Sequence, residues 1–230
     1  AAALRIAEAG GKVVVAARDE EKLAEVRRKI AELGGFVKTY SCDITDYAAN
    51  DQLAKDILKE FGHVDVLINN AGRSIRRSLA LSYDRFHDFE RTMQLNYFAC
   101  VRLTMNLLPS MTARKNGHVI NVSSIGVLTN APRFSAYVAS KAALESFVRC
   151  AASEFHDEGV HFTIINMPLV RTPMIAPTKI YEDMPTIISP EESADMIADA
   201  IIRKPQRIAT KLGVMAEIMH LVMPKMSEVV

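Results

Sequence analysis

Residues 12–35, KVVVAARDEEKLAEVRRKIAELGG, set out the unit on which the rest of the chain is built. The run KVVVAA (12–17) is β-branched and lacks polar alternation, which is typical of a strand buried on both faces of a parallel sheet. Residues 20–33 carry apolar side chains at helical spacing, at Leu23, Val26, Ile30 and Leu33. Two glycines end this pattern, so the stretch predicts one strand–helix unit.

The same alternation runs through the rest of the sequence. Apolar runs predict further strands at 36–42, 64–70, 118–124, 160–167 and 207–213. Helical patterns predict helices at 47–61, 84–114, 135–158 and 191–203, and residues 1–9 have the character of the middle and end of another. Because parallel neighbours require crossover connections, this order predicts a doubly wound α/β fold, with helices on both faces of a mostly parallel sheet.

The composition excludes several classes of protein. The chain has 230 residues and shows no linker, repeat or low-complexity tract, so we expect a single domain over residues 1–230. With 28 Lys and Arg against 27 Asp and Glu, the net charge of +1 indicates neither nucleic acid nor an anionic membrane as a partner. No apolar run approaches the roughly 20 residues of a membrane-spanning helix, and the first residues lack the layout of a signal peptide.

Cysteine and histidine usage narrows the choice further. Cys42, Cys100 and Cys150 are widely spaced and form no C-x-x-C pair, which argues against a disulfide framework and against a zinc site. We interpret them as small core residues. The six histidines show no metal-ligand spacing, so we expect no metal. Together these features favour a reducing cytoplasm.

The tail VMAEIMHLVMP (214–224) is dense in Met, Ile, Leu and Val. One interpretation is a helix packed on the sheet. The other is a wall of a lipophilic pocket, or a contact with a membrane surface that would make a cytoplasmic protein peripheral to the membrane. The sequence leaves both interpretations open.

The strongest chemical signal is the segment Tyr137-Val-Ala-Ser-Lys141. Its four-residue spacing, at the start of a predicted helix, places the phenol and the ammonium on one helix face, one turn apart. A tyrosine with a pKa of about 10 is a poor acid–base catalyst near neutral pH, but an adjacent cation favours the phenolate and lowers that pKa. The pattern alone is weak, because any helix can carry it by chance.

Small polar residues end three of the predicted strands. Ser123-Ser124 closes the strand that precedes Tyr137, and Asn69-Asn70-Ala71-Gly72 and Cys42-Asp43-Ile44-Thr45 close two others. In an open α/β sheet, ligands bind at the carboxyl ends of the strands. The sequence therefore predicts a crevice at this edge, where a serine hydroxyl can hydrogen-bond a substrate carbonyl beside Tyr137.

These segments together carry a family resemblance over essentially the whole chain. The chain resembles the short-chain dehydrogenase/reductases through segments 69–72 and 168–172 and through Asn96, Ser124, Tyr137 and Lys141. Three longer stretches are similar to the reductase domain of bacterial fatty acyl-CoA reductases: GRSIRRSLALSYDRFHDFERTMQLNYF (72–98), SSIGVLTNAPRFSAYVASKAAL (123–144) and MPLVRTPMIAPTKIY (167–181). The resemblance implies a Rossmann-like fold, and enzymes of that subgroup use NADPH to reduce long-chain acyl-CoA.

The resemblance also implies a role for each of four candidate catalytic residues. Tyr137 would donate the proton to the developing alkoxide, and Lys141 would lower the pKa of Tyr137 and hold the nicotinamide ribose. Ser124 would polarise the carbonyl, and Asn96 would position a water for the return of the proton. The cofactor would supply the hydride, while the protein supplies orientation and charge stabilisation.

The cofactor contacts follow from the same resemblance. Asp43 and Ile44 would contact the adenine, and Asn70, Ala71 and Gly72 the adenosine ribose. Pro168, Val170 and Thr172 would contact the nicotinamide. Tyr137 and Lys141 would also touch the cofactor. Charge favours NADP(H) over NAD(H), because Ala17 takes the place where NAD-preferring folds carry an acidic residue, and Arg18 follows it. The other interpretation of Arg18 is a solvated residue or a helix-cap partner.

Two features depart from the family pattern. The glycine-rich turn that binds pyrophosphate is absent because the sequence begins inside the helix that follows it, so we expect an N-terminally incomplete chain without the first strand. The usual Pro-Gly after the sixth strand is Pro168-Leu169 here, a change shared by the similar acyl-CoA reductases. The family commonly forms homodimers or homotetramers through the helices that correspond to 84–114 and 135–158, and we expect the same here.

Three functions from different classes stay open. The first is NADPH-dependent reduction of a long-chain fatty acyl-CoA to the aldehyde, or of the aldehyde to the alcohol. Arg73, Arg76 and Arg77 would then bind CoA phosphates, unless they form a solvated basic loop. The second is turnover of another lipophilic ketone, aldehyde or secondary alcohol. The third, a catalytically silent nucleotide-binding or scaffold protein, is disfavoured because serine, tyrosine and lysine of the candidate site are all present.

Overall fold

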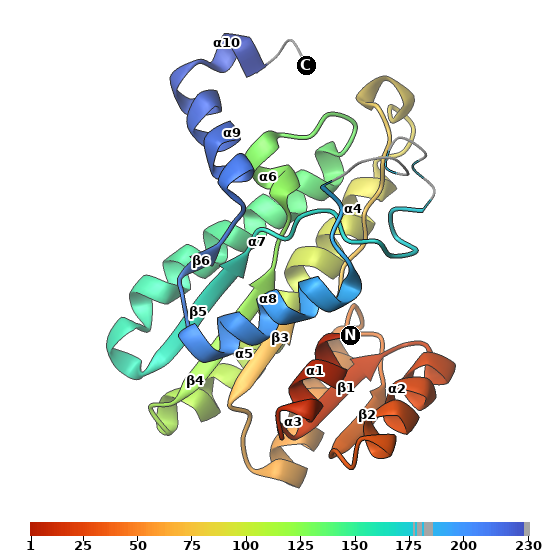
Figure 1. Cartoon of the computed structure of the whole chain (residues 1–230), viewed down its shortest axis with the longest axis vertical. Coiled ribbons are helices and arrows are strands. Elements are labelled where there is room, and N and C mark those ends of the chain that lie inside the picture. Colours follow the sequence, from red (N-terminus) through yellow and green to blue (C-terminus); the bar gives the residue numbers. More distant parts are fainter. Residues whose placement is uncertain (177, 179–180, 182–185, 228–230) are drawn as a thin grey trace.

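The computed structural model describes residues 1–176, 178, 181 and 186–227. Its strands, all parallel, are β1 (Val13–Ala17), β2 (Val37–Ser41), β3 (Val66–Asn69), β4 (Gly117–Val122), β5 (Val160–Ile165) and β6 (Arg207–Ile208). Among the described residues they form two sheets, β1–β2 and a four-stranded sheet in the order β3-β4-β5-β6. Neighbouring strands of the larger sheet follow one another along the chain, with helices between them (Figure 1).

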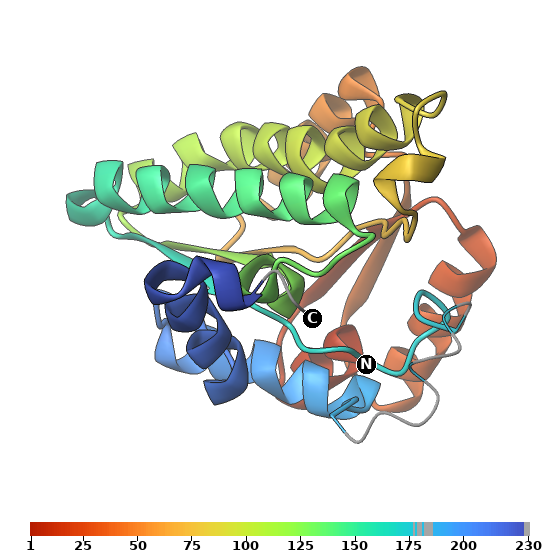
Figure 2. The same ribbon diagram turned by 90° about the horizontal axis from the view of Figure 1, so that it is seen from above.

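Helices cover both faces of the strands. Figure 2 shows α5 (Ala99–Ala113) and α7 (Ser135–Glu154) on one face, and α8 (Pro190–Arg203) with α1 (Ala2–Glu8) on the other. The remaining elements are α2 (Glu20–Glu32), α3 (Tyr47–Phe61), η1 (Leu79–Leu81), α4 (His87–Met93), the π-helical turn η2 (Gln94–Phe98), α6 (Ile125–Thr129), η3 (His156–Glu158), α9 (Lys211–Val222) and α10 (Pro224–Ser227). This arrangement confirms the doubly wound α/β fold, and the regions 84–114 and 135–158 pack beside each other as expected.

Side-chain caps explain where several helices begin. Asp19 and Asp46 accept hydrogen bonds from main-chain N–H groups in the first turns of α2 and α3. Ser189 and Glu192 form a reciprocal capping box around Pro190 at the start of α8. Each cap satisfies main-chain donors that the first helical turn leaves without a partner.

The core is built around β4, all of whose residues are buried. On one face its side chains pack with residues of β5, α5 and α7, among them Leu107, Met111, Val119, Leu144, Val148 and Phe162. On the other face Ile120 and Ile165 pack against Ile197 of α8. The carboxyl end of β4 therefore emerges from a rigid centre between two layers of helices.

Three expectations from the sequence are wrong in detail. β1 is only half-buried beyond Val13, because β2 pairs with one of its edges and no strand of the described chain pairs with the other. β6 ends at Ile208 and does not extend to residue 213, since Thr210 caps α9. Cys150 is exposed and is not a core residue, whereas Cys100 is buried.

Helix α9 does not pack on the sheet. It contacts α6 and stands away from the body of the molecule (Figure 1). Many of its apolar side chains are exposed, namely Leu212, Met215, Ile218, Met219, Leu221 and Val222. The exposure of these side chains contradicts the interpretation of the tail as a helix packed on the sheet.

Gly159 lets β5 begin close to the residues that precede β4. Its φ of 70° lies in the left-handed region, and a Cβ there would collide with the main-chain carbonyl of Lys115. We expect Gly159→Ala to lower the free energy of unfolding by about 3 kcal/mol or more, since positive-φ strain adds to a clash with main chain.

Gly62 provides the matched control for this prediction. It shares a positive φ, at 78°, but its Cβ position opens onto empty space. Gly62→Ala should therefore cost only about 1 kcal/mol. Urea unfolding measures both losses, and equal losses would contradict the steric argument.

Candidate active site

Tyr137 and Lys141 lie on one face of α7, on successive turns. Lys141 is buried, and its Nζ donates a 2.7 Å hydrogen bond to the main-chain carbonyl of Val122, the last residue of β4. Burial lowers the pKa of Lys141, and electrostatic interactions with Cys100 and Glu145 oppose that shift. The lysine therefore links the helix to the end of the central strand.

Ser124 meets Tyr137 at the same strand end. Its Oγ caps α6 by accepting a 3.1 Å hydrogen bond from the N–H of Gly126, and its side chain also hydrogen-bonds Tyr137. Burial raises the pKa of Tyr137, and the bond with Ser124 opposes the rise. The net direction is upward, the opposite of the lowering expected from Lys141, because burial dominates and the lysine Nζ is bound to the strand end.

Asn96 lies in η2, a π-helical turn between α4 and α5. It is fully buried; its Nδ2 donates to the carbonyl of Arg73 and to Ser140 Oγ, both at 2.9 Å, and its Oδ1 accepts from the Arg73 N–H at 2.8 Å. Such turns are rare and occur frequently at functional sites. Asn96 ties the loop after β3 to α7, and both polar atoms of its side chain already have protein partners.

The loop after β3 also approaches Lys141. A Cβ placed at Gly72 would lie 3.4 Å from Asn96 Oδ1 and 3.5 Å from Lys141 Nζ. The neighbouring Asn70 and Ala71 are exposed. Of the residues expected to touch the cofactor after β3, Gly72 therefore lies next to two residues expected to act in catalysis, Asn96 and Lys141.

The ends of β1 and β2 bring Arg18 and Asp43 together. Arg18 Nη1 lies 3.5 Å from Asp43 Oδ2, and Asp43 Oδ1 accepts two hydrogen bonds from Thr45. The Thr45 bonds, assisted by Arg18, lower the pKa of Asp43 although burial acts against them. Ile44 is held through its carbonyl, which accepts a 3.0 Å bond from Asn50. The Arg18 side chain stays 62% exposed at this edge.

The segment expected at the nicotinamide follows β5 at the same edge, at Pro168, Val170 and Thr172. It runs beside the start of α6, where the N–H of Ile125 donates a 2.9 Å bond to the carbonyl of Met167. Val170 forms a parallel bridge, and Thr172 Oγ1 donates to the carbonyl of Val170 at 3.3 Å. Residues 177, 179 and 180 of the stretch similar to acyl-CoA reductases lie outside the described residues.

Sequence reasoning missed a buried carboxylate behind this site. Glu145 accepts hydrogen bonds from Ser123 Oγ and Asn166 Nδ2, and Asn166 Nδ2 also lies 3.4 Å from the carbonyl of Ser124. Burial raises the pKa of Glu145, and its two hydrogen-bond donors oppose the rise. The signal that could have revealed it is the four-residue spacing, which continues from Lys141 to Glu145 on the same helix face.

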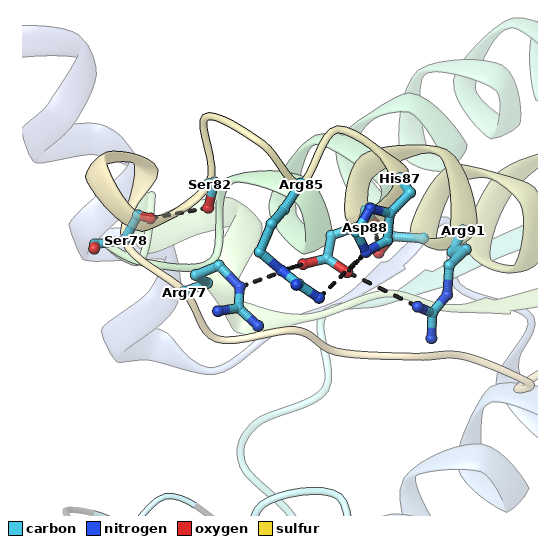
Figure 3. A network of polar contacts seen from close by, with 8 residues as sticks. Arg77, Ser78, Ser82, Arg85, His87, Asp88 and Arg91 are labelled. Carbon is cyan, nitrogen blue, oxygen red and sulfur yellow. Dashed lines mark hydrogen bonds and ion pairs between the residues drawn. The ribbon is translucent and has the colours of Figure 1, made fainter.

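A second buried carboxylate, Asp88, organises the loop that carries Arg77 (Figure 3). Arg77 Nε and Arg85 Nε lie 3.3 Å and 3.1 Å from Asp88 Oδ2, and His87 and Arg91 lie within 4.0 Å of Oδ1. Burial acts to raise the pKa of Asp88, but Arg85 foremost, with His87 and Arg77, lowers it overall. The cluster anchors the loop after β3 to the start of α4.

Other features of the described residues do not add a second centre. No group of three or more His, Cys, Asp or Glu side chains among them is arranged to hold a metal ion. In the same part of the chain, no helix combines the length and apolar character needed to cross a membrane. A surface hollow of about 470 Å³ lies before β1 and β2, lined in part by Gly10, Gly11, Gly34 and Gly35, and contains none of the candidate residues.

Comparison with known proteins places this chain in a family. The model of the short chain dehydrogenase family matches residues 1–182. A fatty acyl-CoA reductase of Acinetobacter baylyi is 58% identical over 227 residues, which cover 99% of this chain and 77% of the relative. A fatty acyl-CoA reductase of Mycobacterium tuberculosis is 45% identical over 93% of this chain and 72% of its own length.

Solved structures agree with the sequence relatives. A metagenomic short-chain oxidoreductase in complex with NADP is similar with a TM-score of 0.76 and 27% identity, over 90% of this chain and 89% of its own. The family model covers well over half of the chain, and the parallel fold with its polar strand ends is consistent with it. The chain therefore belongs to the short-chain dehydrogenase/reductase family of NAD(P)-dependent oxidoreductases.

Proposed function

We propose that this protein uses NADPH to reduce a long-chain fatty acyl-CoA to the aldehyde, or the aldehyde to the alcohol. The observation that carries the proposal is the convergence of Ser124, Tyr137 and Lys141 at the end of β4. Two relatives named fatty acyl-CoA reductases support the substrate class, at 58% and 45% identity. The exposed apolar side of α9, beside α6, suits a lipophilic substrate.

The described residues fit a nicotinamide cofactor. Gly72 leaves open the space beside Lys141 Nζ that a Cβ would fill, so Lys141 and Tyr137 would hold the nicotinamide end there. Arg18 presents an exposed guanidinium at the ends of β1 and β2 and would bind a 2′-phosphate, which favours NADPH. When bound, the cofactor supplies the hydride.

The protein's own groups hold the developing charge and supply the proton. Ser124 and Tyr137 would both hydrogen-bond the carbonyl oxygen of the substrate. The hydroxyl of Tyr137 is protonated near neutral pH, as a proton donor in reduction must be, although burial raises its pKa away from the range in which proton transfer is most efficient. With a thioester, the same two groups hold the oxyanion while CoA thiolate leaves, so no enzyme thiol is needed as a nucleophile.

Among the arginines after β3, Arg76 is the best candidate for binding CoA phosphates. The guanidinium of Arg77 is engaged by Asp88, whereas Arg76 is exposed. Burial raises the pKa of Tyr181, and the charge of Arg76 opposes the rise, so Arg76 lies near the segment that follows β5. An exposed cation there would meet phosphates at the mouth of the site.

We also propose a homodimer or homotetramer formed through α5 and α7. Phe98 directly precedes α5 and Met105 lies within it, and they are 45% and 61% exposed. Sedimentation of the protein should show a dimer or tetramer, and Met105→Glu should shift it toward monomer. A wild-type protein that sediments as a monomer at micromolar concentration would remove this claim.

Tyr137→Phe should abolish turnover while leaving the Kd for NADPH within a few-fold, because a proton donor acts mainly in the transition state. Lys141→Ala should lower turnover and also weaken the binding of NADPH. Initial rates and NADPH fluorescence titration measure the two quantities, with Tyr83→Phe, at a tyrosine 86% exposed, as control. Retention of more than about a tenth of kcat in Tyr137→Phe would rule out the acid role, since such groups contribute roughly 10²–10⁴-fold.

Arg76→Glu should raise the KM for palmitoyl-CoA about tenfold and leave the KM for the free aldehyde nearly unchanged, because only the thioester carries phosphates. Lys55→Glu, at an exposed cation of α3, is the control. An equal rise for both substrates would contradict the phosphate contact.

Replacing Cys42, Cys100 and Cys150 by Ser should leave acyl-CoA reduction largely intact, because the chemistry needs no enzyme thiol.

Release of CoA tests the substrate class itself. A protein that consumes NADPH with aldehydes or ketones but never releases free CoA from palmitoyl-CoA would sink the acyl-CoA assignment. That result would favour a reductase of another lipophilic carbonyl compound.

A further inference from the structure

We propose that Glu145 is a positioning residue of the reaction, whose carboxylate holds the Ser123–Ser124 strand end against α7 and keeps Lys141 cationic. The inference deepens the proposed site of Ser124, Tyr137 and Lys141 and rests on it. It gives a role to the buried carboxylate of Glu145, which neither donates the proton nor binds the substrate carbonyl.

The geometry of the carboxylate supports the first half of this role. Glu145 lies one turn beyond Lys141 on α7 and is only 4% exposed. Its Oε1 accepts from Ser123 Oγ, the residue directly before Ser124, and from Asn166 Nδ2 at 2.6 Å. A single carboxylate oxygen therefore joins the ends of β4 and β5 to the helix that carries the proton donor.

The orientation of Asn166 is itself determined by a neighbour. Arg207 Nε donates a 2.8 Å hydrogen bond to Asn166 Oδ1, so the amide must present its NH₂ group to Glu145. Arg207 Nη2 in turn binds Glu217 of α9 at 2.9 Å. Glu145 thus receives a donor whose direction is enforced, which is the environment that an ionised carboxylate prefers.

The charges around Lys141 support the second part of the proposal, that Glu145 keeps this lysine cationic. Burial lowers the pKa of Lys141, and Cys100 and Glu145 raise it. Burial also raises the pKa of Cys100, so its thiol is uncharged near neutral pH. Burial raises the pKa of Glu145 overall, and its hydrogen bonds and the guanidinium groups of Arg207 and Arg149 oppose that rise. The geometry favours the anion, because Asn166 Nδ2 donates to Oε1 at 2.6 Å and Arg149 Nη1 lies 3.7 Å from Oε2, so Glu145 is the group that can supply the negative charge.

A glutamine at position 145 separates this role from a purely structural one. Its amide oxygen can still accept the hydrogen bonds of Ser123 and Asn166, but it carries no charge. A residue that only clamps the strand end would leave the protonation of Lys141 untouched when replaced by Gln. If the charge of Glu145 keeps Lys141 protonated, the same replacement lowers the pKa of Lys141.

Carbon NMR of protein labelled at the ε position of lysine measures the protonation of Lys141, with the signal assigned by Lys141→Arg. In Glu145→Gln the pKa of Lys141 should fall by about one unit, whereas Glu154→Gln, at an exposed residue near the end of α7, should leave it unchanged. An unchanged Lys141 in Glu145→Gln would overturn the proposal. This measurement needs no substrate, so it stands even if the acyl-CoA assignment fails.

The pH profile of kcat, with NADPH and any aldehyde that the protein reduces, provides the kinetic readout. In Glu145→Gln the basic limb should move to lower pH by about one unit, and activity should recover as the pH falls, because solution protons restore the ammonium. Glu145→Ala should stay impaired at every pH, since the clamp on Ser123 is lost as well. A uniform loss in Glu145→Gln with an unshifted limb would leave only a structural role and contradict the proposal.

Glu145→Asp keeps the test decisive if the Gln variant does not fold. The shorter side chain retains the charge but withdraws it from Ser123 and Asn166. Lys141 should then keep a pKa close to that of the wild type while kcat falls several-fold. A wild-type kcat, or a pKa of Lys141 lowered by a full unit, would contradict one half of the role.

Discussion

The candidate site depends on burying one lysine at the point where a helix meets the end of a strand. Removing an ammonium from water costs several kcal/mol unless hydrogen bonds and a counter-charge replace its hydration. Here the carbonyl of Val122 provides the hydrogen bond at 2.7 Å, and the charge of Glu145 opposes the loss of the proton. Both partners require α7 to lie close against β4, which places Tyr137 beside Ser124.

The polar groups around Lys141 satisfy one another and thereby hold separate elements together. Asn96 joins the loop after β3 to α7, and the pair of Glu145 and Asn166 joins β4 and β5 to the same helix. Each of these side chains is buried, so an unmade hydrogen bond would carry the full cost of desolvation. Such a fully bonded network rigidifies its surroundings, and it holds the candidate residues Ser124, Tyr137 and Lys141 close together.

Carboxylates shape the rim of the site as well as its interior. Asp88 draws Arg77 and Arg85 onto the loop after β3, whereas Asp43 leaves the Arg18 side chain 62% exposed. The difference lies in burial, because the carboxylate of Asp88 has little access to water and must be neutralised by its neighbours. Arginines that follow different strands can thus serve different purposes, one completing the fold and another available to a ligand.

The amino-acid sequence by itself determined the alternation of strands and helices and the placement of polar residues at strand ends. The helix expected at 47–61 is α3 (Tyr47–Phe61), and the segments around Gly72, Ser124 and Tyr137 do converge. These features follow from local rules, because apolar periodicity and strand length are properties of neighbouring residues, and parallel topology brings all carboxyl strand ends to one edge.

Only the tertiary structure decided which buried charges face one another. Glu145 meets Ser123 and Asn166 across 22 and 21 positions of the chain, and no local pattern encodes that contact. The upward direction of the Tyr137 pKa and the exposure of α9 were equally invisible, since both depend on how much water the assembled fold excludes. Periodicity is written along the chain, whereas desolvation and pairing of charges are properties of the packed molecule.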